Sequence, residues 1–144
     1  MFSNQDSLWL RSLIKTFASA RKVYPTLANG VTLTTGTGAW ALGNFIEVIP
    51  ANAIAKRFRL DTANFAVFSI NTTYEIIFYK GTAGNEVEIG RCRANPGGAT
   101  SAVHDKPLYT ALLDANTRVV AKVANSTASQ GTVVVSLTYH EDEA

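Results

Sequence analysis

The sequence predicts an all-β protein, an antiparallel β-sandwich or jelly roll of about eight strands with an N-terminal amphipathic helix. Two observations support this fold class. Residues 1–22 repeat their apolar residues at helical spacing, whereas residues 30–140 alternate with a period of two in short segments separated by turn residues. With 144 residues, the chain has room for one core, so we expect a helical arm at 1–24 and one sandwich domain at 25–144.

The N-terminal helix is predicted from its cap and its apolar stripe. Ser3, followed three residues later by Asp6, resembles a capping box. Pro25 ends the segment, because the residue before a proline disfavours the helical conformation. The apolar stripe consists of Leu10, Leu13, Ile14 and Phe17.

Charge separates this segment from the rest of the chain. The first 22 residues carry four basic residues against one acidic residue, a net +3, and the remainder carries nine basic and ten acidic residues, a net −1. An isolated helix of about 15 residues is marginal in water, so the segment must pack on its own sandwich, on sibling subunits or on a partner. We expect it to act as a docking arm through Leu10, Arg11, Leu13, Ile14, Lys15, Phe17, Arg21 and Lys22.

The first half of the sandwich is predicted to hold strands near 31–34, 45–49, 57–61 and 65–70. The run 65–70 is apolar on both faces, which indicates a central strand. A turn at 36–38 separates the first two strands.

The clearest hairpin joins strands at 74–79 and 86–93 through a turn at 80–85. Val87 and Ile89 are predicted to face the core, with Glu86 facing out. A bulge at Gly90 would then turn Cys92 inward and leave the neighbouring arginines, Arg91 and Arg93, outside.

The second half begins with a long loop from 95 to about 106. A short strand is expected at 108–113, another at 118–123, and the most regular one at 132–140. The acidic tail 141–143 is expected outside the core.

Composition disfavours several classes of function. The body intersperses basic with acidic residues, so we expect no nucleic-acid partner. No apolar run approaches a membrane span or a signal peptide, so we expect synthesis in the cytoplasm and no membrane partner. Cys92 is the single cysteine and cannot form an intrachain disulfide.

No residue constellation predicts a reaction, so we expect no enzyme activity, no catalytic residues, no cofactor and no metal site. His104 lies in a predicted loop and His140 faces outward, and neither is placed beside a nucleophile. Exposed aromatic residues offer one other chemistry, because rings in loops and at strand ends can stack on sugars. Trp40, Tyr24, Tyr79 and Tyr109 lie in or near loops and strand ends, with Trp40 and Tyr109 as the named candidates, although completing the core is the simpler role for most of the four.

Three segments carry a resemblance to a known group of proteins. They are Tyr74-Glu75-Ile76-Ile77-Phe78-Tyr79-Lys80-Gly81, Glu86-Val87-Glu88-Ile89-Gly90-Arg91 and Ala115-Asn116-Thr117-Arg118-Val119. With them, residues 30–140 resemble small virion structural proteins of tailed bacteriophages, of the capsid decoration or cement type.

The resemblance implies a non-enzymatic sandwich module in the virion, a homotrimer that binds the major capsid protein and braces the shell. The alternative function is a carbohydrate-binding β-sandwich module of a phage tail or host-recognition apparatus, with Trp40 and Tyr109 as its stacking residues.

Overall fold

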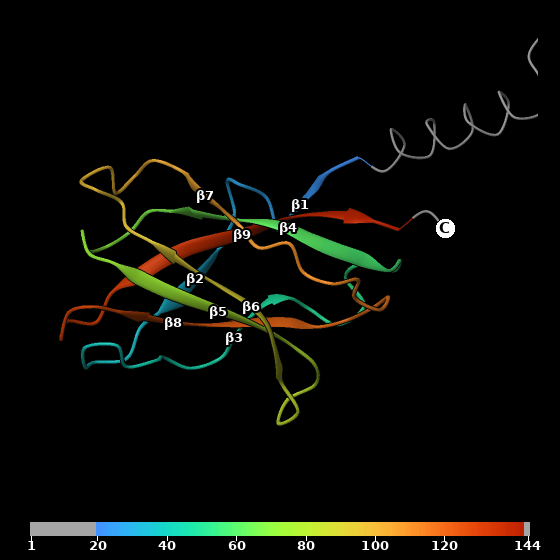
Figure 1. Cartoon of the computed structure of the whole chain (residues 1–144), viewed down its shortest axis with the longest axis horizontal. Helices are drawn as coiled ribbons and strands as arrows, with labels where there is room; N and C mark the ends of the chain where they lie inside the picture. The colour runs from blue at the N-terminus through green and yellow to red at the C-terminus, as the bar shows by residue number, and fades with distance from the viewer. Residues whose placement is uncertain (1–19, 143–144) are drawn as a thin grey trace, which may run out of the picture.

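The computed structural model describes residues 20–142, and over that range it is all-β, with two antiparallel sheets packed face to face (Figure 1). The sandwich prediction is therefore confirmed, with nine strands in residues 20–142 in place of about eight. One sheet contains β1 (Lys22–Tyr24), β2 (Val31–Thr34), β4 (Phe58–Ala66), β7 (His104–Pro107) and β9 (Thr132–Glu141). The other contains β3 (Ile46–Ile49), β5 (Tyr74–Lys80), β6 (Val87–Ala94) and β8 (Val119–Asn125).

The strand order follows from how the chain crosses between the sheets. The first sheet has the order β1-β9-β4-β7, and β2 pairs with the same edge of β9 as β1 does, nearer the start of β9. The second sheet has the order β3-β8-β5-β6. From β2 onward the chain alternates between the sheets in the order of a jelly roll, with the one hairpin β5–β6 inside a sheet.

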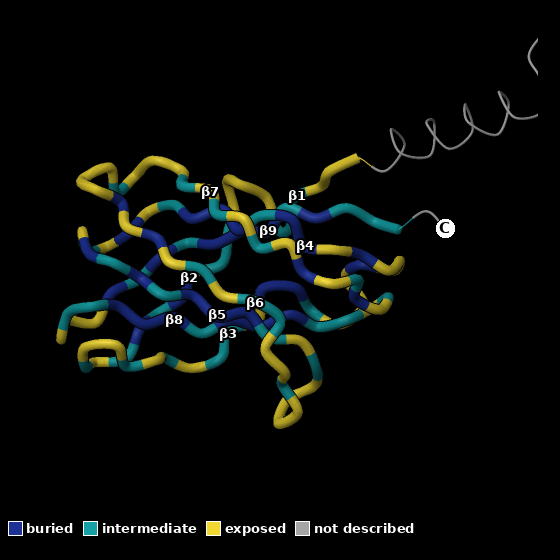
Figure 2. The backbone as a smooth tube through the Cα atoms, in the orientation of Figure 1, coloured by how far each residue is buried: buried dark blue, intermediate teal, exposed yellow. Residues whose placement is uncertain are grey.

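The core lies between the sheets, where period-two alternation turns one face of each strand inward, and most exposed segments are loops (Figure 2). Along β9, Val133, Val135 and Leu137 point inward and are fully buried, as the sequence predicts for this strand. Phe58 and Phe65 of β4 meet them in the same cluster. Each such side chain contributes about 1.5–3 kcal/mol by burial, so the alternation of these strands fixes which faces meet.

The prediction of a separate strand at 65–70 is wrong. β4 runs without interruption from Phe58 to Ala66, and the next residue, Val67, is exposed with a φ of 50°. A bulge between Leu60 and Thr62 explains the error. It turns the polar Asp61 aside in mid-strand, so the alternation in the sequence breaks where the strand itself continues.

The predicted strand at 108–113 is also wrong, because the ladder partner of β4 is β7, at His104–Pro107 within the expected loop. Residues 108–113 follow β4 only through irregular contacts. The backbone N–H groups of Leu108 and Tyr109 both donate to the Asp61 carbonyl, and Leu113 forms an isolated bridge with Phe58. The β4 bulge at Asp61 prevents a regular ladder here.

The β5–β6 hairpin and its bulge are confirmed. The register shifts between Phe78, opposite Gly90, and Tyr79, opposite Glu88, and Cys92 packs against the core. The predicted faces at the start of β6 are wrong. Val87 is 58% exposed, whereas the Glu86 side chain is only 9% exposed beside Arg118. The ion pair holds the Glu86 side chain against Arg118, and the next residue, Val87, therefore faces solvent.

Loops gather at two ends of the sandwich. We call the loop end the one formed by residues 35–45, 67–73, 95–103 and 126–131, which are joined by backbone hydrogen bonds such as Phe68 N–H to the Thr100 carbonyl. We call the terminal end the one formed by residues 50–57, 81–86 and 108–118. The start of β1 and the end of β9 also lie there, because Lys22 pairs with Tyr139 (Figure 1).

Candidate functional site

The predicted docking arm is described only at its last residues. Leu10, Arg11, Leu13, Ile14, Lys15 and Phe17 lie outside the described residues, as does the predicted helix up to residue 19. Arg21 is exposed, and Lys22 does not end a helix: it begins β1, so the last three residues assigned to the arm belong to the sheet. The Lys22 Nζ lies 3.1 Å from Glu141 Oε1, which ties the start of β1 to the end of β9.

The two predicted stacking residues are exposed, but the structure does not bring them together. Trp40 is 43% exposed and its backbone N–H donates to the Asn125 carbonyl of β8, whereas Tyr109 is 72% exposed and is held by the Asp61 carbonyl of β4. The two rings are thus anchored on different sheets and make no common platform. The Arg93 guanidinium also lies over the Trp40 ring, 4.9 Å from its centroid, and occupies one face of it.

The other two aromatic residues, Tyr24 and Tyr79, pack against neighbouring side chains. Tyr24 packs against the core cluster. Tyr79 meets Phe45 edge to face, with 5.0 Å between ring centroids.

Outside the core, the outer face of the β3-β8-β5-β6 sheet is charged, and its charges are paired. The Arg91 Nε lies 2.6 Å from Glu88 Oε1, and Glu75 receives both Arg91 and Arg93 at 3.5 Å and 3.8 Å. Lys122 Nζ lies 4.0 Å from the centroid of the Phe45 ring. Mutually neutralised charges of this kind form a solvated surface and offer few free groups to a ligand.

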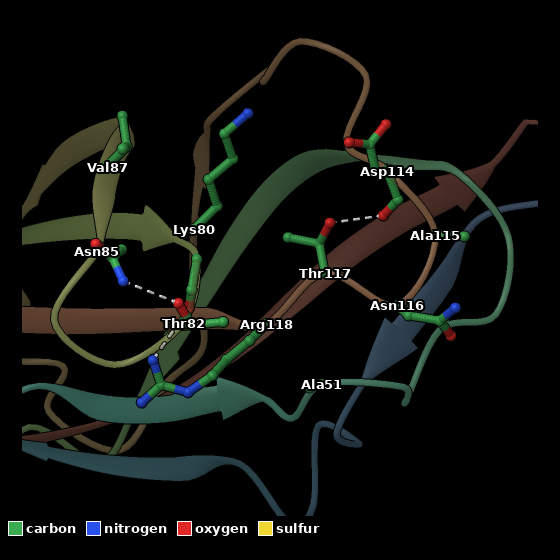
Figure 3. A pocket seen from close by; sticks show the side chains of 11 residues that line it. Ala51, Lys80, Thr82, Asn85, Val87, Asp114, Ala115, Asn116, Thr117 and Arg118 are labelled. Atoms are coloured by element: carbon green, nitrogen blue, oxygen red, sulfur yellow. Dashed lines mark hydrogen bonds between the residues drawn. The ribbon is translucent and has the colours of Figure 1, made fainter.

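A pocket of about 380 Å³ opens at the terminal end, between the β5–β6 turn and the loop that leads into β8 (Figure 3). The sequence does not predict this pocket, because its walls come from segments that lie far apart in the chain and meet only in the folded protein. Its lining consists of Ala51, Lys80, Gly81, Thr82, Asn85, Val87, Asp114, Ala115, Asn116, Thr117 and Arg118.

Arg118 forms the base of this pocket and is fixed by three partners. Its Nε donates to Glu47 Oε2 at 2.8 Å, its Nη1 donates to the Gly81 carbonyl at 3.2 Å, and Glu86 Oε1 lies 3.5 Å from Nη1. The pKa of Glu86 is lowered, first by backbone N–H hydrogen bonds and then by Arg118. The base is therefore a fixed ion-paired cluster in which one arginine lies between two glutamates.

The rim of the pocket keeps polar groups available. Lys80 and Asp114 are exposed on opposite sides of it (Figure 3), and within residues 20–142 neither side chain has an ion-pair partner. Such a rim can hydrogen-bond a polar ligand or a partner's side chain, but it presents no nucleophile beside a base.

The titratable residues weighed for catalysis have structural contacts. His140 Nδ1 lies 3.0 Å from both Asp61 carboxylate oxygens, and His104 Nε2 lies 2.9 Å from the Ala99 carbonyl oxygen. Burial raises the pKa of the Cys92 thiol to about 12, which keeps it protonated and unreactive. Among the described residues, no group of three or more His, Cys, Asp or Glu side chains is placed to hold a metal ion. That part of the chain also contains no helix with the length and hydropathy to span a membrane.

Comparison with known proteins shows similarity of fold only. No family model matches the chain, and no curated protein matches it. Among solved structures, the CBM36-1 domain of a multidomain xylanase from the hindgut metagenome of Trinervitermes trinervoides matches at 7% identity and a TM-score of 0.49, covering 87% of this chain and 99% of that one.

Two viral structures are also similar. The cyanophage Pam1 capsid asymmetric unit matches at 20% identity and a TM-score of 0.44, covering 85% of both chains. A protein of infectious bursal disease virus, Gt strain, matches at 13% identity and a TM-score of 0.44 over 85% of this chain, which spans 32% of that one. The neighbours thus include a cyanophage capsid structure, a structure of infectious bursal disease virus and the CBM36-1 domain of a xylanase, and we take no functional argument from them.

Proposed function

We propose that this chain is a non-enzymatic structural protein of a tailed-phage virion, which decorates and stabilises the capsid as a homotrimer bound to the major capsid protein. The observation that carries the proposal is the position of β1. It fixes residue 22 to the sheet edge at the terminal end, beside Glu141, so the cationic and amphipathic segment before it leaves a rigid body from one defined point.

The segment has the composition of a docking element. Burying its stripe of Leu10, Leu13, Ile14 and Phe17 would stabilise a contact by on the order of 5–10 kcal/mol, before the cost of ordering the segment. Three basic residues of the segment before β1, Arg11, Lys15 and Arg21, favour an acidic surface. Repetition over the many equivalent sites of a shell turns a modest affinity into firm attachment.

The test compares two full-length variants for co-sedimentation with empty heads assembled from the major capsid protein. Leu13→Gln with Phe17→Gln removes half of the stripe, whereas Ser12→Gln with Thr16→Gln changes the opposite face and serves as the control. We expect the first variant to lose attachment and the control to keep it. Full attachment of the stripe variant would refute the docking arm.

A second candidate function, the carbohydrate-binding module of a tail or host-recognition apparatus, is favoured by the exposure of Tyr109. A ring that is 72% exposed in a loop is available for stacking on a sugar, unlike Trp40, which already carries Arg93. Glycan-array binding that disappears in Tyr109→Ala and persists in Trp40→Ala would support it. No binding by the wild type would remove it.

A further inference from the structure

The arginines of the sandwich divide into paired and unpaired ones. Six arginines lie within residues 20–142. Four of them have carboxylate partners at nitrogen–oxygen distances between 2.6 and 3.8 Å, namely Arg57, Arg91, Arg93 and Arg118. Arg21 and Arg59 are exposed and have no ion-pair partner within the same residues. These two side chains are therefore available to an anion from outside the sandwich.

The two unpaired arginines belong to one row across three strands. Arg59 of β4 lies directly opposite His140 of β9. On the other side of β9, Lys22 pairs with Tyr139, so the residue before it, Arg21, continues the register to His140. Directly opposite residues have Cβ atoms about 5 Å apart, so the two arginine side chains start about 10 Å apart with His140 between them. We call Arg21, His140 and Arg59 the basic row.

The basic row faces solvent on the outer side of its sheet. Phe58 and Leu60, which flank Arg59 along β4, are fully buried in the core, as Tyr139 beside His140 nearly is. Alternation along the two strands therefore turns Arg59 and His140 outward.

Asp61 holds the middle of the row in place. Both of its carboxylate oxygens lie 3.0 Å from His140 Nδ1, and the Asp61 side chain is only 9% exposed. The opposite edge of the imidazole, with Nε2, is thus directed away from Asp61. The aspartate orients the ring from below and does not cover the arginines.

The other described carboxylates at this corner of the sheet are engaged by other cations. Glu141 Oε1 lies 3.1 Å from Lys22 Nζ, and its Oε2 lies 3.9 Å from Lys56 Nζ. Asp142 Oδ2 lies 2.8 Å from Arg57 Nη2. Two like charges without a counter-ion on one outward row favour an anionic partner, because complementary charge lowers their mutual repulsion.

We propose that the basic row binds carboxylates on an acidic protein surface, and that this surface belongs to the major capsid protein. A planar guanidinium matches a carboxylate with two parallel hydrogen bonds, so arginine suits this partner better than lysine does. Two arginines about 10 Å apart fit separate Asp or Glu side chains of a folded surface. A nucleic acid would require a longer track of cations along its phosphates.

The position of the row agrees with this partner. Arg21 is the last residue before β1, so the row begins where the N-terminal segment leaves the sandwich. Arg11 and Lys15 of that segment carry the same sign of charge. The inference rests on the proposed function and deepens it, since it adds a contact made by the sandwich itself to the contact made by the segment.

The first measurement uses a defined acidic probe and the full chain. Acetylated hexaglutamate is titrated at low ionic strength, and NMR records which amide and imidazole signals shift. Arg59→Gln removes one charge from the basic row. Lys80→Gln is the matched control, because it removes one charge from another exposed side chain without an ion-pair partner in residues 20–142.

We expect the peptide to shift the signals of the basic row. Arg59→Gln should weaken its binding about threefold, as expected for the loss of one exposed ion pair, and Lys80→Gln should leave it unchanged. Equal affinity of Arg59→Gln and the wild type, or shifts confined to other parts of the chain, would overturn the inference. Tighter binding of hexathymidylate than of the peptide would overturn the choice of a protein partner. Binding at the row only after Glu143→Gln would show that the chain's own acidic end fills it, which would also overturn the inference.

A second measurement, co-sedimentation of the same variants with empty heads, separates the basic row from the proposed function. A wild type that binds the peptide through the row but does not attach to heads counts against the proposed function and upholds the row as a carboxylate site. Attachment that Arg59→Gln leaves at full strength counts against the row and not against the docking arm.

Discussion

Replacing Asn125 should destabilise the loop end of the sandwich, and the structure sets the magnitude. Asn125 is fully buried at the end of β8. Its Nδ2 donates to the Ser129 carbonyl at 3.0 Å, and its Oδ1 accepts from the Thr127 N–H at 3.1 Å and from the Thr127 hydroxyl at 3.2 Å. Three neutral hydrogen bonds contribute about 1 kcal/mol each, and water can replace part of them at the exposed Ser129, so Asn125→Ala should cost about 2 kcal/mol.

A second substitution at the same position separates hydrogen bonding from packing. Asn125→Asp keeps the shape and both acceptor contacts but loses the donor to Ser129 and buries a carboxyl. Burial raises the pKa of such a carboxyl above its unfolded value, so the folded state is favoured below the unfolded pKa, and that advantage is lost as the pH rises through the folded pKa. The variant should therefore be closest to wild type near pH 4 and weakest at neutral pH.

Urea unfolding followed by far-ultraviolet circular dichroism measures both effects. Asn44→Ala, at an exposed position, is the control and should change the free energy of unfolding by less than about 0.5 kcal/mol. If Asn125→Ala behaved like this control, or if Asn125→Asp gained stability with rising pH, the reasoning from these hydrogen bonds would be refuted.

Other predictions concern the core, a close contact and two titrating groups. Leu137→Ala should cost about 2–5 kcal/mol by denaturant unfolding, because it opens a cavity in a fully buried position, whereas the partly exposed Thr138→Ala should cost much less. Gly43→Ala should lower the melting temperature clearly, because a Cβ there would overlap the Thr34 carbonyl oxygen, whereas Gly84→Ala meets no atom within 4 Å and is strained only by its positive φ. Cys92 should resist thiol reagents at pH 8 until the protein unfolds, and its contribution to stability should fall between pH 9 and about 12, where the unfolded thiol ionises and the folded one does not. Glu86→Gln should remove part of the acid sensitivity of unfolding, because the lowered pKa of Glu86 stabilises the folded state above the unfolded pKa of about 4.5 and that contribution is lost as the pH falls; unchanged acid unfolding in this variant would argue against the backbone N–H and Arg118 contacts of Glu86 together.

The sequence predicts strands well where one face is apolar along the whole strand. Val133, Val135 and Leu137 alternate cleanly, and β9 lies where the alternation places it. The same pattern divides β4 wrongly because Asp61 bulges out of its ladder, and it misses β7 because His104–Pro107 has no apolar face and is a strand only by pairing with β4. Tertiary pairing overrides local pattern at both places.

The candidate sites depend on the fold more than on the pattern. The places of Trp40 and Tyr109 in loops could be predicted from the sequence, but their anchoring on different sheets requires the fold. Arg118 likewise contacts Glu47 of β3 and Glu86 of the β5–β6 turn. These residues lie far apart in the sequence, so no local pattern predicts the contact.

The start of β1 and the end of β9 lie at the terminal end, so the loop end is available for engineering. Gly97 and Gly98 lie at the loop end in left-handed conformations, and a Cβ atom at either position would meet no atom within 4 Å. A foreign peptide inserted between them would extend away from both ends of the described chain, joined by a turn already suited to a flexible linker. If the proposed docking arm holds the protein on a shell, an insert at the loop end would lie away from the point of attachment, and the protein would serve as an oriented carrier for displayed sequences.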